Sequence, residues 1–584
     1  MDIVSNPSNH DLPHRLADFA TLSEALDYAA TGATGFDFYD SKGRLKEAMP
    51  YSELRRRARS VARKLLGTGL SRGDRIAAVA ETDPEFAVLF FACQYAGLVP
   101  VALPISLNLG GHAAYVEQLR RLLVGSRPAL ALAPTELMPF LEEAAEGLPG
   151  LAPRSFGDLE ASPEADVEPR ATEPEEVAYL QFTSGSTRFP RGVVITESMV
   201  MSNLRGIVRQ GLAVRRGDRC VSWLPFYHDM GLVGCLLGPV VSQLTVDYLR
   251  TRDFAVRPVQ WLKLISRNRG TIAFGPPIAY QLCDQRLRAD DIAELDLSSW
   301  RIAGVGAEMI RLAPLERFAN SLKSARFDPR AFLPCYGLAE SSLAVAFSPV
   351  DGGVLAERVD ADALSDEGVA VPAGPDAREV REVVNCGQVL PEHEVVIRDE
   401  AGASLGYRRT GRVMVRGPSV MSGYFDDPES TKEVLAEDGW LETGDLGYLT
   451  EEGLFVTGRS KDLIIINGRN IWPQDLEYLA EQQQQVRIGD ASAFGVSDPD
   501  GMENAVLVVQ CRISEVAERA QLVSQIQSSI YASFGVHCLV DLVPPRTLPK
   551  TSSGKLSRDA ARRGFLERVV WDEPLAVAKV AGKA

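Results

Sequence analysis

The sequence has no closely spaced pair of cysteines. Its eight cysteines are scattered along the chain, none forms a C-x-x-C pair, and most lie in apolar surroundings. A disulfide framework relies on cysteines that can pair, whereas a scattered set in apolar segments is typical of a reducing compartment. We therefore interpret all eight as buried free thiols.

The chain also lacks a secretory signal, a membrane span and an excess of positive charge. Its N-terminus has no basic region followed by an apolar core. The most apolar window, 87–105, is interrupted by Gln94, Gly97, Pro100 and Pro104, which predicts a helix and then a strand. A net charge of −16 argues against general binding of nucleic acid or anionic membranes. We expect a cytoplasmic protein with no nucleic-acid partner and no stable membrane insertion.

With 584 residues, the chain is too long for a single hydrophobic core. Helical and strand patterns alternate over residues 20–170, which predicts a mostly parallel sheet with helices on both faces. Short alternating strands near 394–397, 412–416 and 453–457 predict a small β-rich subdomain. The residues beyond 460 suffice for a further small domain.

The most informative segment is Tyr179–Thr196, YLQFTSGSTRFPRGVVIT. Two apolar runs, each predicted to be a strand, flank a loop of hydroxyl residues, glycine and arginine. Hydroxyls and free backbone N–H groups suit a polyphosphate, whose oxygens accept many hydrogen bonds. A solvated hairpin turn is the alternative, and the spacing of the P-loop is absent.

Further along the chain, several predicted strands end in glycine-bearing turns. These segments are 271–280, 300–310 and 332–343, and His228 follows another strand end beside aromatic residues. Because α/β sheets place ligands at the carboxyl ends of their strands, the segments predict one pocket along one sheet edge. A core histidine is the alternative for His228.

Two other segments differ from their surroundings. Residues 350–384 are polar, acidic and rich in Gly and Pro, so a surface excursion with a short helix near Asp360–Leu364 is the simplest interpretation. A strand-bounded acidic turn is predicted at Asp445. The late loop Pro545–Arg558, PRTLPKTSSGKLSR, combines hydroxyls and cations as the first loop does, and a basic surface loop is the alternative.

Seven motifs occur in the order seen in adenylate-forming enzymes, the superfamily of acyl-CoA synthetases, peptide-synthetase adenylation domains and luciferases. They are T-S-G-S-T-x-x-P-x-G (183–192), H-D-M-G-L (228–232), G-A-E (306–308), Y-G-L-A-E (336–340), T-G-D (443–445), G-R-x-K-D (458–462) and P-x-T-x-S-G-K (549–555). Within the superfamily the sequence most resembles the fatty acyl-AMP ligases. Arg188 in the first loop, L-P-C-Y-G-L-A-E (333–340) and an insertion near 350–384 point there, whereas Arg191 departs from the lysine of many synthetases.

The resemblance implies an α/β fold. A large N-terminal domain, residues 1–459, would contain two βα-layered subdomains and a small β-rich subdomain. A small mobile α+β domain, residues 460–584, would follow as a lid that carries the catalytic lysine.

The resemblance also implies a role for each motif residue. Five consecutive residues would cradle the triphosphate of ATP: Thr183, Ser184, Gly185, Ser186 and Thr187. Adenine would stack on Tyr336, and the nucleotide slot would also include Gly306, Ala307, Glu308 and Gly337. Asp445 would accept hydrogen bonds from both ribose hydroxyls, with Arg459 nearby.

Four residues form the implied catalytic set: Lys555, Glu340, His228 and Thr183. Glu340 would hold Mg²⁺, which prefers oxygen ligands. His228 would lie by the carboxylate of the acid, and Lys555 would bridge that carboxylate and the α-phosphate. Lys461 is the candidate hinge.

The implied reaction is adenylation of a medium- or long-chain fatty acid, in polyketide or lipopeptide biosynthesis or related lipid metabolism. Val233, Gly275, Pro276 and Ile278 are apolar enough for a tunnel wall, and equally they could be core. The acyl group would pass to the phosphopantetheine thiol of an acyl carrier protein. The alternatives are an acyl-CoA synthetase and a nucleotide-binding relative that has lost the chemistry.

Overall fold

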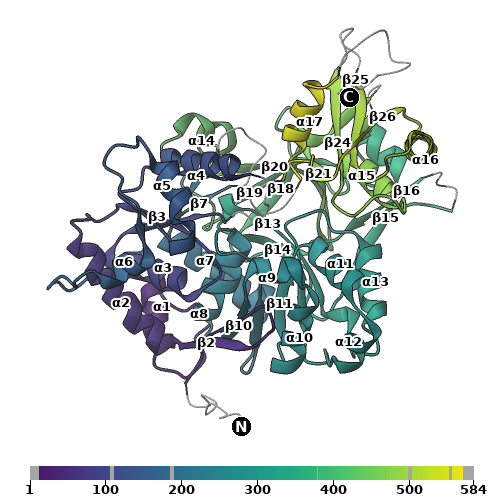
Figure 1. Cartoon of the computed structure of the whole chain (residues 1–584). Coiled ribbons are helices and arrows are strands. Elements are labelled where there is room, and N and C mark those ends of the chain that lie inside the picture. Colours follow the sequence, from purple (N-terminus) through teal and green to yellow (C-terminus); the bar gives the residue numbers. More distant parts are fainter. Residues whose placement is uncertain are drawn as a thin grey trace.

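The computed structural model describes residues 12–105, 111–183, 190–375, 377, 379–466, 469–497, 503–550 and 556–569. Two large sheets form the body. The elements after residue 460, called the C-terminal lobe below, lie on top of it (Figure 1). Among the described residues, no helix is both long and apolar enough to cross a bilayer. All eight cysteines are free and seven are buried, so the interpretation as free thiols is confirmed.

The first sheet contains the predicted parallel core. Its strand order is β6 (Arg154–Ser155), β5 (Leu130–Ala133), β3 (Arg75–Val79), β4 (Val99–Leu103), β7 (Val177–Phe182) and β8 (Gly192–Thr196). Neighbouring strands are parallel except for the last pair, β7 and β8. The surrounding helices are α1 (Leu22–Ala29), α2 (Tyr51–Gly67), α3 (Pro84–Ala96), α4 (His112–Ser126), α5 (Met138–Ala145) and α6 (Phe156–Ala161).

Helix α3 shows how the sequence builds this layer. Asp83 caps its N-terminus, Pro84 occupies the first turn, and Gly97 ends it in the left-handed conformation. Its residues are apolar on all sides and almost all are buried, as expected for a helix enclosed within a large core.

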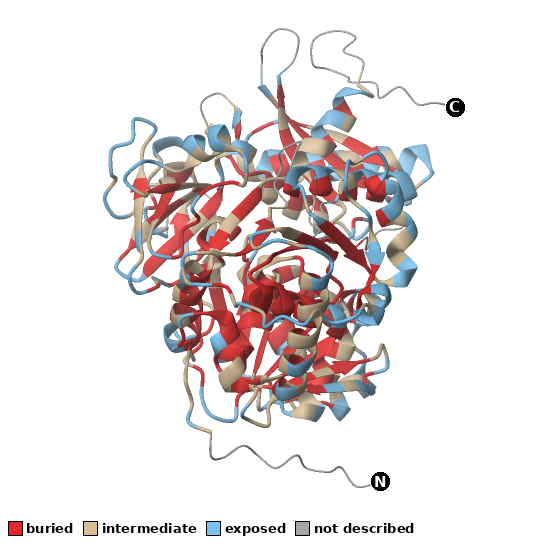
Figure 2. Cartoon of the chain, turned by 90° about the vertical axis from the view of Figure 1, so that its left-hand side faces the viewer, coloured by how far each residue is buried: buried red, intermediate tan, exposed pale blue. Residues whose placement is uncertain are grey.

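The second sheet is longer and also has a parallel centre. Its order is β17 (Gln388–Val389), β14 (Ala344–Phe347), β13 (Phe332–Gly337), β12 (Ile302–Val305), β11 (Ile272–Gly275), β9 (Arg219–Ser222), β10 (Thr245–Leu249), β1 (Gly35–Tyr39) and β2 (Leu45–Pro50). Its buried residues belong to two hydrophobic clusters, and Figure 2 shows the interior of the body as mostly buried. The helices from this part of the chain are α7 (Glu197–Gly206), α8 (Gly238–Val241), α9 (Thr251–Val256), α10 (Val259–Asn268), α11 (Pro277–Arg286), α12 (Ala289–Glu294) and α13 (Leu312–Ser321).

The remaining strands form small sheets, and the α/β class predicted from the sequence is confirmed. The β-rich part consists of β18 (Glu394–Arg398), β19 (Gly411–Arg416), β20 (Leu441–Thr450) and β21 (Gly453–Arg459), with α14 (Pro428–Val434) between β19 and β20. Beyond it lie the hairpin β22 (Ile464–Ile466) and β23 (Arg469–Ile471), and the sheet β24 (Ala491–Ser497), β25 (Glu503–Gln510) and β26 (Cys538–Val543). This last sheet packs with α15 (Pro473–Glu481), α16 (Val516–Phe534) and α17 (Arg558–Leu566).

The segment 350–384 is more than a surface excursion. It forms a hairpin, β15 (Ala356–Asp360) and β16 (Val380–Val384), and the predicted short helix is a π turn, η6 (Ala363–Glu367). Four of its residues are buried against Tyr448, Phe455 and Trp472: Val359, Leu364, Ala370 and Val383. The sequence prediction missed this small core because its apolar residues are isolated between polar ones.

A buried carboxyl group, that of Glu197, joins helix α7 to helix α1. Glu197 begins α7, is fully buried, and its Oε2 accepts a hydrogen bond from the Leu22 N–H of α1 at 2.9 Å. Its other oxygen has no hydrogen-bond partner among the residues that the structure describes. Burial in apolar surroundings disfavours the charged form and raises the pKa of Glu197 to about 8.

This raised pKa predicts a loss of stability at alkaline pH. The folded state holds the Glu197 proton up to about pH 8, whereas the unfolded state releases it near the ordinary glutamate pKa of 4.5. We expect the free energy of unfolding to fall by roughly 2–3 kcal/mol between pH 6 and pH 9. Urea unfolding at both values tests this. In Glu197→Gln the fall should be largely absent, and an equal fall in both proteins would contradict the assignment.

Candidate active site

A cavity of about 850 Å³ is lined by residues at the strand ends of the second sheet, by residues of the β-rich part and by residues of the C-terminal lobe. Its position agrees with the rule that α/β sheets bind ligands at the carboxyl ends of their strands. The cavity brings together predicted site residues that are far apart in sequence: Thr183, His228, Pro276, Ile278, Ala307, Glu308, Tyr336, Gly337, Glu340, Asp445, Arg459 and Lys461. Ser184, Gly185, Ser186, Thr187 and Lys555 lie outside the described residues.

Asp445 forms the centre of one side of the cavity. The Tyr336 hydroxyl donates to its Oδ2 at 2.7 Å, and Arg459 Nε lies 3.2 Å from its Oδ1. Tyr336 is in β13, whereas Asp445 and Arg459 face each other across β20 and β21. The prediction of a turn at Asp445 was wrong, because the residue lies within β20, next to Gly444 with its φ of +76°. Two donors hold the carboxylate, and its oxygens can accept further hydrogen bonds from a diol.

Glu340 follows β13 in the 3₁₀ turn η5 (Ala339–Ser341). Its Oε1 accepts a hydrogen bond from the Tyr424 hydroxyl at 2.9 Å, and burial raises the pKa of the Glu340 carboxyl. The guanidinium of Arg191 lies over the Tyr424 ring, 5.2 Å from its centroid. The sequence analysis missed Tyr424, which belongs to no recognised motif.

Glu340 suits a magnesium ion that is held mainly by a substrate. Among the described residues, no group of three or more His, Cys, Asp or Glu side chains could hold a metal. Mg²⁺ is commonly bound through one or two carboxylates together with phosphate oxygens and water. A single carboxylate on the cavity wall fits that mode of binding.

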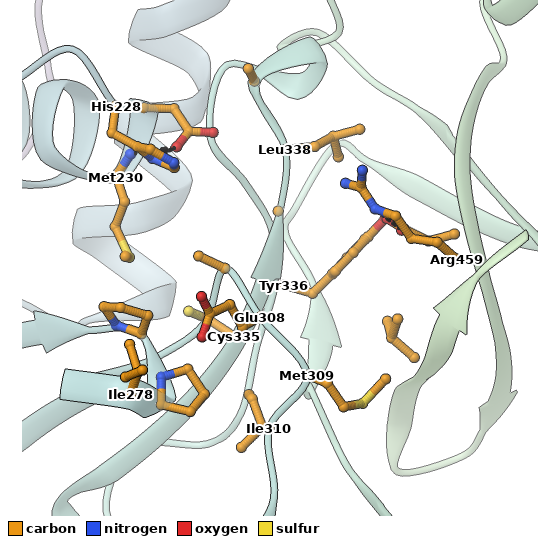
Figure 3. A pocket seen from close by; sticks show the side chains of 18 of the residues that line it. His228, Met230, Ile278, Glu308, Met309, Ile310, Cys335, Tyr336, Leu338 and Arg459 are labelled. Atoms are coloured by element: carbon orange, nitrogen blue, oxygen red, sulfur yellow. Dashed lines mark hydrogen bonds and ion pairs between the residues drawn. The ribbon is translucent and has the colours of Figure 1, made fainter. Parts of the chain in front are cut away.

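His228 lies at the opposite wall, beside Met230 (Figure 3). Its Nδ1 is 2.6 Å from Asp229 Oδ1, which also accepts the Met230 N–H at 2.7 Å. Gln181 at the end of β7 donates to the Tyr227 carbonyl at 2.9 Å. The turn that carries His228 is therefore fixed to the strand that leads into the first loop. Asp229 and Gln181 are further residues that the sequence analysis did not assign.

The apolar part of the cavity lies below His228 in Figure 3. Its labelled residues are Met230, Ile278, Met309, Ile310 and Cys335, with Glu308 projecting beside Cys335. Pro276 and Ile278 of the predicted tunnel line this part. Val233 is fully buried in the core and does not line it. Gly275 does not line it either, and a Cβ at this position would come within 2.9 Å of the Ala279 Cβ.

Two further predicted residues lie at the margins. Gly306 does not line the cavity, but an added Cβ there would be 2.8 Å from the Cys335 Sγ, so the close packing of β12 and β13 needs glycine. Lys461 is exposed in the 3₁₀ turn η7 (Ser460–Asp462). The residues next to the segment 551–555 also line the cavity: Lys550, Leu556, Ser557 and Arg558.

The similarity to known proteins extends over nearly the whole chain. The family model described as AMP-binding enzyme matches residues 37–425. A Caulobacter vibrioides protein, provisionally named an acyl-CoA synthetase, is 43% identical over 98% of this chain and 99% of its own length. The medium-chain-fatty-acid–[acyl-carrier-protein] ligase JamA of Moorena producens is 30% identical over 97% of this chain and 99% of its own. A solved structure from a study of fatty acyl-adenylate ligases of E. coli and L. pneumophila has a TM-score of 0.92 and 50% identity, covering 95% of this chain and 99% of that one.

Proposed function

Because this chain belongs to the AMP-binding enzyme family and is similar to fatty acyl-adenylate ligases, we propose that it adenylates a fatty acid. The acid would be of medium or long chain, and ATP and Mg²⁺ would be required. The observation that carries the proposal is one cavity that joins a hydrogen-bonded Asp445, a half-buried Glu340 and an apolar wall. These three features suit a ribose, a phosphate-bound cation and an acyl chain respectively.

The chemistry requires positioning and charge stabilisation rather than an acid–base pair. A carboxylate oxygen of the fatty acid attacks the α-phosphorus of ATP, and the bond to the departing pyrophosphate breaks. Charge on the phosphate oxygens rises in the transition state, so fixed cations and hydrogen-bond donors lower the barrier. A Mg²⁺ ion bound through Glu340 would supply part of this positive charge.

The chain's own residues would divide the remaining tasks. Tyr336 would stack on adenine, and Asp445 would bind the ribose hydroxyls. His228 would lie by the carboxylate of the acid. Thr183 begins the loop for the triphosphate, and Lys555 would complete the site from the C-terminal lobe with Lys461 as the hinge.

Release of pyrophosphate tests the proposal directly. We expect the purified protein to release pyrophosphate from Mg-ATP when given acids of a C12–C18 series, and to form the matching acyl adenylate. ATP binding without pyrophosphate release for any acid of the series would favour a relative that has lost the chemistry.

For the second step we propose transfer of the acyl group to the phosphopantetheine thiol of an acyl carrier protein. The insertion 350–384 supports this choice, because it contacts the C-terminal lobe through two sets of ion pairs. Arg469 pairs with Asp362 at 2.5 Å and with Asp366 at 3.0 Å. Arg381 pairs with Asp475 at 3.1 Å, and its guanidinium lies 3.8 Å from the Trp472 ring centroid. Such contacts would resist rotation of the lobe to a position that admits free CoA.

Free CoA as acceptor is the second candidate, favoured by the name of the Caulobacter vibrioides relative. Incubation with fatty acid, Mg-ATP and either CoA or acyl carrier protein separates the two. Abundant acyl-CoA would overturn the choice of a carrier protein.

Replacing Arg469 with Ala should raise the yield of acyl-CoA relative to that of the acyl carrier protein thioester. The ion pairs of Arg469 are half exposed, so each stabilises the contact between the insertion and the C-terminal lobe by at most about 1 kcal/mol. We expect acyl-CoA formation to rise by roughly two- to tenfold, with pyrophosphate release unchanged. Arg512→Ala, an exposed arginine on the same lobe, is the matched control. An unchanged ratio of the two thioesters in Arg469→Ala would count against the proposed role of the insertion.

A further inference from the structure

A network of buried hydrogen bonds adjoins the turn that carries Glu340. Four of its members are fully buried and do not line the cavity: Asn203 of α7, Ser341 and Ser342 of the turn, and Ser419 between β19 and α14. Burying polar side chains costs free energy unless each finds its partners. A fully satisfied network can, however, fix one geometry of the backbone around it.

The backbone just after Glu340 is strained. Ser342 has a φ of +63° and a ψ of −56°, and the Leu343 N–H donates to the Ser341 carbonyl at 2.7 Å. This is the rare form of the γ-turn with a positive φ, which is unfavourable for a residue that has a side chain. Such a conformation persists only where the surrounding structure holds it.

The side-chain amide of Asn203 holds the end of this turn. Its Oδ1 accepts the Ala344 N–H at 3.0 Å, and its Nδ2 donates to the Ala344 carbonyl at 2.8 Å. One side chain therefore pairs with both backbone groups of the first residue of β14. The second hydrogen of Nδ2 is donated to the Ser419 hydroxyl at 3.0 Å.

Ser419 connects the turn to the β-rich part. Its carbonyl accepts the Ser342 hydroxyl at 2.9 Å, and its own hydroxyl lies 3.2 Å from the Ser341 hydroxyl. Two residues further along, the Met421 N–H donates to the Glu340 carbonyl at 2.8 Å. The segment that contains Ser419 is thus bonded to the turn both before and after its strained residue.

His393 takes the remaining hydrogen of the Ser419 hydroxyl. Its Nδ1 lies 2.8 Å from the Pro391 carbonyl, so this nitrogen carries a hydrogen. Burial lowers the pKa of His393, which favours the neutral ring. Its Nε2 then accepts the Ser419 hydroxyl at 2.6 Å.

We propose that Ser419 and Asn203 are positioning residues for Glu340. Together they hold the strained turn, so that the Glu340 carboxylate occupies one place on the cavity wall, where the Tyr424 hydroxyl donates to it. The inference rests on the proposed function, in which Glu340 holds a Mg²⁺ ion bound to ATP. Neither Ser419 nor Asn203 would touch the nucleotide, the cation or the acid.

Binding of ATP to Ser419→Ala, with and without Mg²⁺ and in the absence of a fatty acid, tests this role. Residues that orient a metal ligand typically account for about 10- to 100-fold in metal affinity or activity, so the affinity for ATP in excess Mg²⁺ should fall by about tenfold. In EDTA it should stay within about twofold of the wild type, because other residues bind adenine and ribose. Isothermal titration calorimetry measures both affinities.

The control is Ser242→Ala. It also removes a fully buried hydroxyl that donates to a backbone carbonyl, that of Gly238, but Ser242 does not line the cavity and lies outside the network. Both affinities of this variant should match those of the wild type. A selective loss of Mg-ATP affinity in Ser242→Ala as well would show that the effect is not specific to the turn.

A double variant separates positioning from general stabilisation. Glu340→Gln should itself lose most of the affinity that Mg²⁺ adds, and Ser419→Ala should cause no further loss in that background. Losses that multiply in the double variant, or wild-type affinity for Mg-ATP in Ser419→Ala, would overturn the proposal.

His393 provides a second pair of variants, which serves if Ser419→Ala does not fold. His393 is half-buried at the edge of the network. His393→Ala removes the acceptor of the Ser419 hydroxyl and should lower the affinity for Mg-ATP but not for ATP in EDTA. His393→Gln offers an amide oxygen as acceptor and should restore it. Equal affinities of the two variants for Mg-ATP would contradict the proposal.

Failure of the proposed function would have a different signature. A wild-type protein that binds ATP equally well with and without Mg²⁺ would overturn the proposed role of Glu340, and this inference with it. Selective loss of Mg-ATP affinity in Ser419→Ala, in a protein that releases no pyrophosphate with any acid, would overturn the proposed reaction and support the positioning role.

Discussion

Lys555→Ala should abolish acyl-adenylate formation while leaving ATP binding almost intact. In the proposed mechanism Lys555 bridges the attacking carboxylate and the α-phosphate, and both gain from its charge chiefly in the transition state. Loss of one such contact costs roughly 3–4 kcal/mol, or two to three orders of magnitude in kcat. ATP–pyrophosphate exchange and equilibrium nucleotide binding, measured on the same preparation, test the two halves of the prediction.

The control is Lys323→Ala, which removes the same charge from an exposed position away from the cavity. It should retain the wild-type exchange rate. Exchange at the wild-type rate in Lys555→Ala would sink the assignment of Lys555. Loss of nucleotide binding together with exchange would indicate a role in ground-state binding instead.

The second large effect is expected at Asp445. Asp445→Ala removes the proposed ribose acceptor, and it leaves the Tyr336 hydroxyl and the Arg459 guanidinium without the partner that holds them. Hydrogen bonds to a charged group contribute about 1.5–3 kcal/mol, so the KM for ATP should rise by roughly 10- to 150-fold. Steady-state kinetics with ATP as the varied substrate measure this.

Tyr336→Phe provides the matched comparison. It removes the hydroxyl that bonds Asp445 but keeps the ring for stacking and the carboxylate for the ribose. We expect a rise in the KM for ATP of only about two- to fivefold, since the ribose acceptor stays and only one of the two donors that hold it is lost. Equal effects of the two substitutions would show that Asp445 matters only through Tyr336.

Much of the framework could be predicted from the sequence because it depends on short-range patterns. The strand at 177–182, the buried helix after Asp83 and the parallel βαβ order follow from apolar periodicity and from capping residues. The ordered motifs also identified the segments that meet at the cavity. They specify backbone turns and hydroxyl-rich loops, which are local properties of the chain.

Other features were decided by contacts between distant segments. No local signal distinguishes Val233, which is buried in the core, from Ile278, which lines the cavity, because both are apolar residues near glycines. Likewise, Tyr424 reaches Glu340 only because a loop of the β-rich part folds back toward β8.

The sequence by itself determined the family, the order of the elements and the types of residue available for the chemistry. Only the tertiary structure decided which of them face one another: Tyr336 with Asp445, Arg381 with Asp475, and Asn203 with Ser419. The physical reason is that helix and strand preferences act over a few residues, whereas the position of a side chain in the cavity depends on packing between elements separated by tens to hundreds of residues.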